Sequence, residues 1–277
     1  MTVGLVRAHH VQVLKLRAQL THHVGRAWQL LGGPDDEDQA RFVARAVPLV
    51  HGAQRHAAVL MAAYLGATIA SSGRGRPVFV SADQVIARAR NGATSADVYA
   101  RPTITMRAKL GGGASYDEAL RMAGVRAESA ASTDVMLANR EAAVQGFDAV
   151  AAETGERVVG YRRVLTGASC AFCAAASTRR YRSEDLMPLH DHCDCDVAPI
   201  IGDRDPGNVI NRDVLAELKG RGPEYWKSKG FVGDDGKPID PAAAVENDDV
   251  PVGVAEHGEL GPVLVDPADQ FTGPDDL

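Results

Sequence analysis

The chain has 277 residues, of which 45% are hydrophobic and only 5% are aromatic. This length fits one large domain or two small ones, and the abundance of alanine favours helices packed through small side chains over an aromatic-rich β-sandwich. The sequence contains no run of eighteen apolar residues, so it predicts no membrane span. The N-terminus lacks the apolar core and cleavage site of a signal peptide. We therefore expect that the protein has no membrane partner and that it is located in a reducing cytoplasm.

The net charge of −6 is unevenly distributed along the chain. Residues 234–277 contain twelve acids and a single base, so this segment carries −11 and the first 233 residues carry +5. Pro, Gly and acidic residues with few large apolar side chains are typical of disorder, which predicts a largely disordered acidic tail. One apolar island at 257–265, HGELGPVLV, is expected to dock onto a partner or to fold back onto the chain.

The N-terminal region has the apolar periodicity of helices. Three-and-four spacing predicts a helix over residues 3–31, and the next helix, capped by Asp35 and Asp36, extends to about Ser71. Shorter helices are expected over 82–90 and from 94 or 95 towards 110. We interpret the histidine doublets of the first helix, His9-His10 and His22-His23, as surface or core-edge residues, because adjacent positions on a helix do not face one point.

A second set of helices follows the break at Gly111-Gly112-Gly113. Ser115 and Glu118 form a capping box that opens a helix through Met122, and a longer helix is expected over residues 127–152. The helix expected over residues 127–152 carries a group of polar side chains that we interpret as a solvated face. This group consists of Thr133, Asp134, Asn139 and Arg140.

The pattern changes after Gly155. The sequence predicts a strand over 157–165, a short helix over 171–177 and a closing strand over 196–201. The predicted fold class is mainly α, with a helical N-terminal body, a small α+β zinc-knuckle module and the acidic tail. The predicted divisions are 1–113, 114–202 and 203–277.

All four cysteines of the chain lie in this small module. Thiolates and imidazoles are the ligands that Zn²⁺ prefers, in a tetrahedral set of four. Cys170 and Cys173 have the spacing of a metal knuckle, and we expect two or more of His190, Cys193 and Cys195 to complete a structural zinc site. His192 is the least favoured candidate. A closed four-ligand site stabilises a small module and has no open position for catalysis, so we expect no enzyme.

Other interpretations of the cysteines remain open. Two disulfides are disfavoured in a reducing compartment, and a catalytic Cys–His pair would leave three thiols without a role. The zinc deaminase pattern does not fit, because its His-x-Glu precedes the Cys-x-x-Cys. An alternative function is a zinc-dependent nucleic-acid-binding module, since Arg179, Arg180 and Arg182 lie between the two ligand clusters, with Arg162 and Arg163 on the preceding strand.

The arrangement of Cys-Ala-Phe-Cys followed by His-Asp-His-Cys-Asp-Cys resembles the MuF-like head-morphogenesis (minor capsid) proteins of tailed bacteriophages, in particular those that infect actinobacteria. The family's motif is a Cys-x-x-Cys followed by a His-x-x-Cys-x-Cys, which Cys170, Cys173, His190, Cys193 and Cys195 match. The resemblance covers residues 115–202 and part of the tail.

The resemblance implies a virion protein present in few copies. Its expected partners are the portal protein or the major capsid protein, with packaged DNA as a further partner, and it would assist head assembly and DNA packaging. Its expected location is the capsid interior or portal vertex, and the host cytoplasm during assembly. Some relatives carry an enzymatic toxin domain after this module, and the short, polar tail predicts none here.

Overall fold

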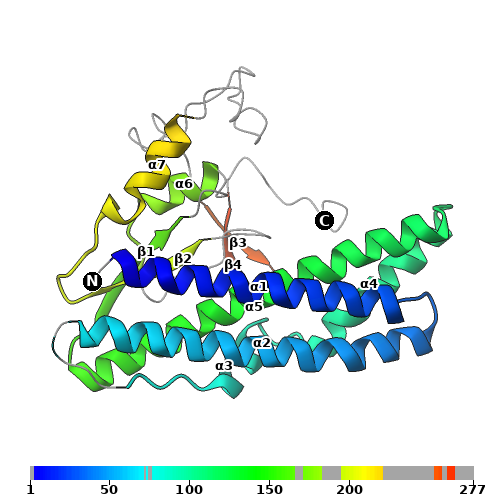
Figure 1. The fold of residues 1–277 in the computed structure, drawn as a ribbon, viewed down its shortest axis with the longest axis horizontal. Coiled ribbons are helices and arrows are strands. Elements are labelled where there is room, and N and C mark those ends of the chain that lie inside the picture. The colour runs from blue at the N-terminus through cyan, green and yellow to red at the C-terminus, as the bar shows by residue number, and fades with distance from the viewer. Residues whose placement is uncertain are drawn as a thin grey trace.

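The computed structural model describes residues 3–71, 73, 77–165, 171–182, 195–220, 253–257 and 261–265. Five helices form the body of the molecule: α1 (Val3–Leu31), α2 (Asp36–Ala70), α3 (Ala82–Arg88), α4 (Ser95–Gly111) and α5 (Tyr116–Thr154). Helices α1, α2 and α5 pack against one another, and α4 packs on α2 and α5. Figure 1 shows α1 and α2 as an antiparallel hairpin with α5 behind them. Within the described residues, every helix is too short or too polar to cross a membrane.

The helix starts follow from local capping chemistry, as the sequence predicts. The side chains of Asp35, Ser81, Thr94 and Ser115 each accept a hydrogen bond from the backbone N–H three residues later. Such caps satisfy N–H groups that the first helical turn leaves without partners. Pro48 and Pro102 both lie inside helices, so neither ends the element in which it stands.

Helix α5 is continuous from Tyr116 to Thr154, whereas the sequence suggested two helices separated near Gly124. The reason is a close approach between α5 and Trp28 of α1. A Cβ atom at Gly124 would lie 3.0 Å from the indole Cδ1, and the indole N–H donates a hydrogen bond of 2.9 Å to Leu120 O. Gly124 therefore admits the Trp28 ring at this crossing, and the helix continues past it.

Small residues form the contact surface of α5. Ala119, Ala123, Ala127 and Ala131 recur every four residues, and all four are fully buried. Residues four apart lie on one face of a helix, so these alanines form a stripe against which neighbouring helices pack at short range. The helices thus pack through alanine, as the composition suggested.

A buried ion pair joins α5 to the segment that connects α3 and α4. Arg90 Nε lies 2.7 Å from Asp134 Oδ1, and Tyr99 Oη donates to Asp134 Oδ2 at 2.8 Å. The prediction that the polar group of α5 is solvated was therefore wrong, because Asp134, Asn139 and Arg140 are all buried. Their partners lie far away in sequence and do not show in the local pattern.

A small sheet follows the helices. Strand β1 (Val158–Val164) pairs antiparallel with β2 (Asp196–Ile201), and α6 (Ala171–Ser177) lies between them in sequence. After β2 come η2 (Asn208–Asn211) and α7 (Arg212–Lys219). Both strands contact α5, and β2 also contacts α1, so the sheet rests on the helical body.

The predicted tail contains one described element, a hairpin of β3 (Gly253–His257) and β4 (Gly261–Val265). This hairpin forms at the apolar island, and Val263 at its centre is buried. The rest of the segment from residue 221 onward lies outside the described residues, and the predicted disorder therefore stays a prediction.

Ala127→Leu should lower the free energy of unfolding by about 1–3 kcal/mol, because the larger side chain overpacks the alanine stripe. Val125→Leu is the matched control, since Val125 stands on the same helix with 56% of its surface exposed. It should change the stability by less than about 0.5 kcal/mol. Urea unfolding followed by circular dichroism compares the two, and equal stabilities would contradict the close packing of α5.

Candidate functional site

Both backbone edges of β1 carry hydrogen-bond partners. One edge pairs with β2. On the other edge, the backbone N–H and C=O of Tyr161 bond to Tyr181 at 2.9 and 3.0 Å. Further along, Asn211 accepts from Leu165 N at 2.9 Å and donates to Arg163 O at 2.8 Å. The Asn211 side chain thus takes the place of a neighbouring strand.

Tyr181 can approach β1 this closely because residue 160 is glycine. A Cβ atom at Gly160 would lie 2.4 Å from Tyr181 O. The rings of Tyr161 and Tyr181 stack with their centroids 5.2 Å apart. The segment after α6 is therefore fixed to the sheet by both backbone and ring contacts.

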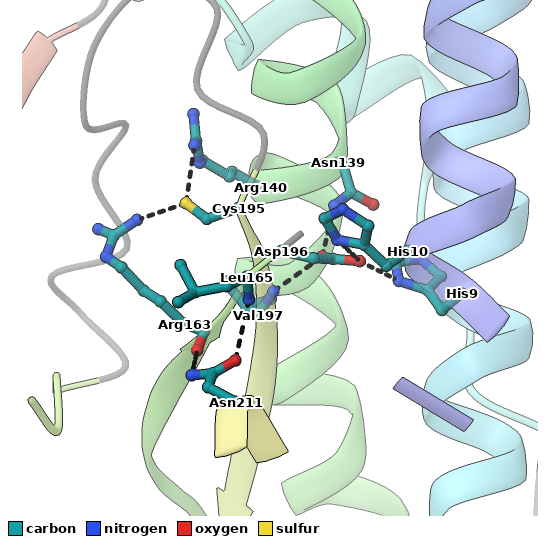
Figure 2. Close-up of polar contacts among 10 residues, drawn as sticks. All are labelled: His9, His10, Asn139, Arg140, Arg163, Leu165, Cys195, Asp196, Val197 and Asn211. Carbon is teal, nitrogen blue, oxygen red and sulfur yellow. Dashed lines mark hydrogen bonds and ion pairs between the residues drawn. The ribbon is translucent and has the colours of Figure 1, made fainter. Parts of the chain in front are cut away.

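The first residue of β2, Asp196, is the centre of a buried polar cluster shown in Figure 2. Its Oδ2 lies 2.7 Å from His9 Nδ1, and an N–H at that nitrogen donates to the carboxylate. Asn139 Nδ2 donates to Oδ1 at 2.9 Å, and Val197 N donates to the same oxygen at 2.8 Å. One carboxylate therefore connects α1, α5 and β2.

The surroundings of Asp196 favour its ionised form. Burial on its own would raise the pKa of Asp196, but the positive field of His9, together with polar contacts from His10 and His9, holds this pKa well below its usual range. His10 Nδ1 lies 3.6 Å from the same oxygen, Oδ2. The cluster therefore places a negative charge in the core.

The histidines carry an energetic cost that the carboxylate offsets. His9 Nε2 and both ring nitrogens of His10 are buried and lack a hydrogen-bond partner among the described residues. Each such group costs about 1–3 kcal/mol when it is removed from water. The His9 ring also stacks on Tyr64 of α2, with ring centroids 4.6 Å apart.

Cys195 lies next to Asp196 but belongs to the opposite side of the strand, as Figure 2 shows. Arg163 Nη1 lies 3.3 Å from Cys195 Sγ, and Arg140 Nη2 lies 3.8 Å from the same sulfur. Arg163 is fully buried, and Arg140 is 5% exposed. The sulfur thus faces two guanidinium groups, one from β1 and one from α5.

The Arg163 guanidinium also lies over two aromatic rings. Its Cζ is 4.8 Å from the centroid of Tyr181 and 5.7 Å from that of Tyr161. Burial raises the pKa of Tyr161 to about 12, with Arg163 opposing this increase, so the phenol stays neutral. Neutral rings present the electron-rich face that attracts a cation.

The structure describes two of the five residues predicted to bind zinc. Cys173, on α6, and Cys195 are both buried. Cys170, His190 and Cys193 lie outside the described residues, as does His192. Within the described ranges, no group of three His, Cys, Asp or Glu residues is placed to hold a metal ion. Cationic donors beside Cys195 are compatible with the thiolate that a metal ligand must be.

The arginines predicted to contact nucleic acid have different environments. Arg180 and Arg182 are exposed, and Arg179, two residues after the end of α6, is half-buried. Arg162 forms a bidentate ion pair with Asp205 at 2.6 and 2.9 Å. Burial removes Arg163 from any surface that could contact a phosphate, so its earlier interpretation was wrong.

The sequence did contain a signal for the histidines of the cluster. On α1, the buried residues Val6, Val13, Leu16 and Leu20 set a three-and-four pattern, and positions 9 and 10 fall within it. The interpretation of His9 and His10 as surface or core-edge residues was therefore wrong. Adjacent helical positions share Asp196, since the Nδ1 atoms of His9 and His10 lie 2.7 and 3.6 Å from the same carboxylate oxygen.

Comparison with known proteins gives one positive result. A family model described as VG15 protein matches residues 2–217, which is more than half of the chain. No curated protein and no solved structure matches the chain.

Asp196→Asn should lower the free energy of unfolding by about 3 kcal/mol at neutral pH, because it removes the charge that His9 and His10 face. Asp203→Asn, at an exposed position in the turn after β2, is the matched control and should change the stability by less than about 0.5 kcal/mol. Thermal or urea unfolding measures both. A loss in Asp196→Asn no larger than that in the control would contradict the central role of this carboxylate.

Proposed function

The chain belongs to the VG15 protein family, a family of phage proteins, and on this premise we propose that it is a MuF-like minor head protein of a tailed phage. In this role it associates with the portal protein or the inner capsid during head assembly and DNA packaging. The family match covers the helical body, the sheet and both described cysteines, Cys173 and Cys195. The resemblance of the Cys/His motif to head-morphogenesis proteins supports the finer assignment.

The observation that carries the proposal is the buried junction at Asp196. His9 and Asn139 both contact the Asp196 carboxylate, and these contacts join the helical body to the cysteine-bearing module. A fixed junction of this kind suits a protein whose task is contact. The three long helices, of 29, 35 and 39 residues, provide the extended surface that such contact needs.

We further propose that the cysteine-bearing module holds a structural Zn²⁺. Cys170 and Cys173 would supply two of the four ligands, and the other two would come from among His190, Cys193 and Cys195. When bound, the metal would join the segment before α6 to the start of β2. The burial of Cys173 and Cys195 supports this assignment, because structural zinc thiolates lie inside a module rather than on its surface.

A second candidate function is nucleic-acid binding through Arg179, Arg180 and Arg182. The exposure of Arg180 and Arg182 favours it. Contacts of this type are with phosphates, so binding to duplex DNA would weaken strongly as salt rises. Salt-insensitive binding, or none, would remove this candidate. The two functions are compatible in a protein that lies near packaged DNA.

Peptides of this chain should occur in purified, nuclease-treated virions at a low and constant ratio to the portal subunit. Quantitative mass spectrometry, with the portal subunit as internal standard, measures this ratio. Presence in procapsids but not in virions would identify a transient assembly factor. Absence from both would overturn the head-protein proposal and favour the nucleic-acid-binding function.

The purified protein should contain about one zinc per chain, and Cys173→Ser should lose it, because metal binding and local folding are a single event. Elemental analysis measures the metal. A strong chelator should lower the thermal stability of the wild type and leave that of Cys173→Ser unchanged. Wild-type protein without metal, or a variant with full metal content, would contradict the site.

A further inference from the structure

We propose that Arg163 and Arg140 hold the sulfur of Cys195 as a metal-bound thiolate, so that the helical body takes part in the metal centre through α5. This inference rests on the proposed zinc site and extends it to two residues that are not ligands. Their role is positioning: each acts on the metal only through the sulfur of Cys195.

The geometry at the sulfur carries the proposal. Arg163 Nη1 and Arg140 Nη2 approach Cys195 Sγ from two different elements, at 3.3 and 3.8 Å. Two N–H donors directed at one sulfur suit an electron-rich acceptor, whereas a neutral thiol accepts hydrogen bonds only weakly. A thiolate bound to a metal retains negative charge and accepts such hydrogen bonds. Residues around metal ligands commonly donate them.

The burial of Arg163 strengthens this argument. A guanidinium with no exposed surface is costly unless charge and hydrogen bonds compensate it. The rings of Tyr161 and Tyr181 supply part of that compensation, since the guanidinium lies over both. A sulfur with negative charge at 3.3 Å supplies an electrostatic partner of the kind that rings alone do not provide.

The neighbouring arginine provides an internal comparison. Arg162 and Arg163 are consecutive on β1, so their side chains point to opposite faces of the strand. Arg162 pairs with Asp205 near the surface, whereas Arg163 faces Cys195 in the interior. The two residues have the same chemistry and local sequence, and they differ in access to the sulfur. Of Arg162 and Arg163, only Arg163 should therefore affect the metal.

Full-length Arg163→Gln should release zinc to a chelator at least about tenfold faster than the wild type, within the range by which the loss of outer partners weakens metal sites. Arg162→Gln should stay within about twofold of the wild type. Release is followed by the absorbance of a zinc-binding dye, at a temperature where each variant retains its native circular dichroism. Arg163→Lys, which keeps the charge but loses the planar fork, serves if Arg163→Gln does not fold.

A loss of stability alone must be separated from an effect on the sulfur. Arg90→Gln removes another buried arginine, one that pairs with Asp134 in the helical body. It should destabilise the protein while leaving the rate of zinc release unchanged. If Arg90→Gln accelerates release as much as Arg163→Gln does, the proposal is overturned, because general destabilisation then explains both.

A wild-type protein that contains zinc, together with an Arg163→Gln variant that retains it equally well, would overturn this inference and leave the zinc site intact. A wild type without zinc would overturn both.

Discussion

The architecture depends on one ionised carboxylate inside the protein. Asp196 accepts hydrogen bonds from Asn139 on α5 and from its own strand, and it faces His9 and His10 on α1. Removing an ion from water is costly, and the cost is offset only when several partners surround it with good geometry. Three elements must therefore occupy their native positions at the same time. The helical body and the sheet consequently form one packed unit at this point, although the residues concerned are separated by 57 and 187 positions in the chain.

The strand that carries Asp196 also separates two kinds of polar chemistry. Successive side chains of a strand point to opposite faces, so Cys195 meets the guanidinium groups of Arg140 and Arg163, while Asp196 meets histidine and amide groups (Figure 2). Helix α5 contributes to both faces through the adjacent residues Asn139 and Arg140. A displacement of β2 would disturb the contacts of Cys195 and those of Asp196 together. The position of the cysteine-bearing module is therefore coupled to that of α1.

The sequence predicts the elements better than it predicts their contacts. Helix starts follow from caps three residues away, and the strands from short runs rich in Val and Ile, so both are local signals. The continuity of α5 was missed because Gly124 reads as a break, whereas its role depends on Trp28, 96 positions earlier. The burial of Asp134, Asn139 and Arg140 was missed for the same reason, since their partners are distant in sequence. The cysteine cluster was recognisable because its spacing is local, and Cys195 proved to be buried beside two cations that no spacing rule identifies.

The occupied edges of β1 have a consequence for how the protein meets other chains. An open strand edge is a template for pairing with any extended segment, which leads to aggregation at high local concentration. On the edge of β1 that faces away from β2, Tyr181 bonds to both backbone groups of Tyr161, and the amide of Asn211 bonds to Arg163 O and Leu165 N. A strand from another chain therefore cannot pair with the backbone of β1 at these positions. A partner that binds here must recognise side chains. Association at this edge is thereby restricted to partners that fit its side chains, and non-specific strand pairing is suppressed.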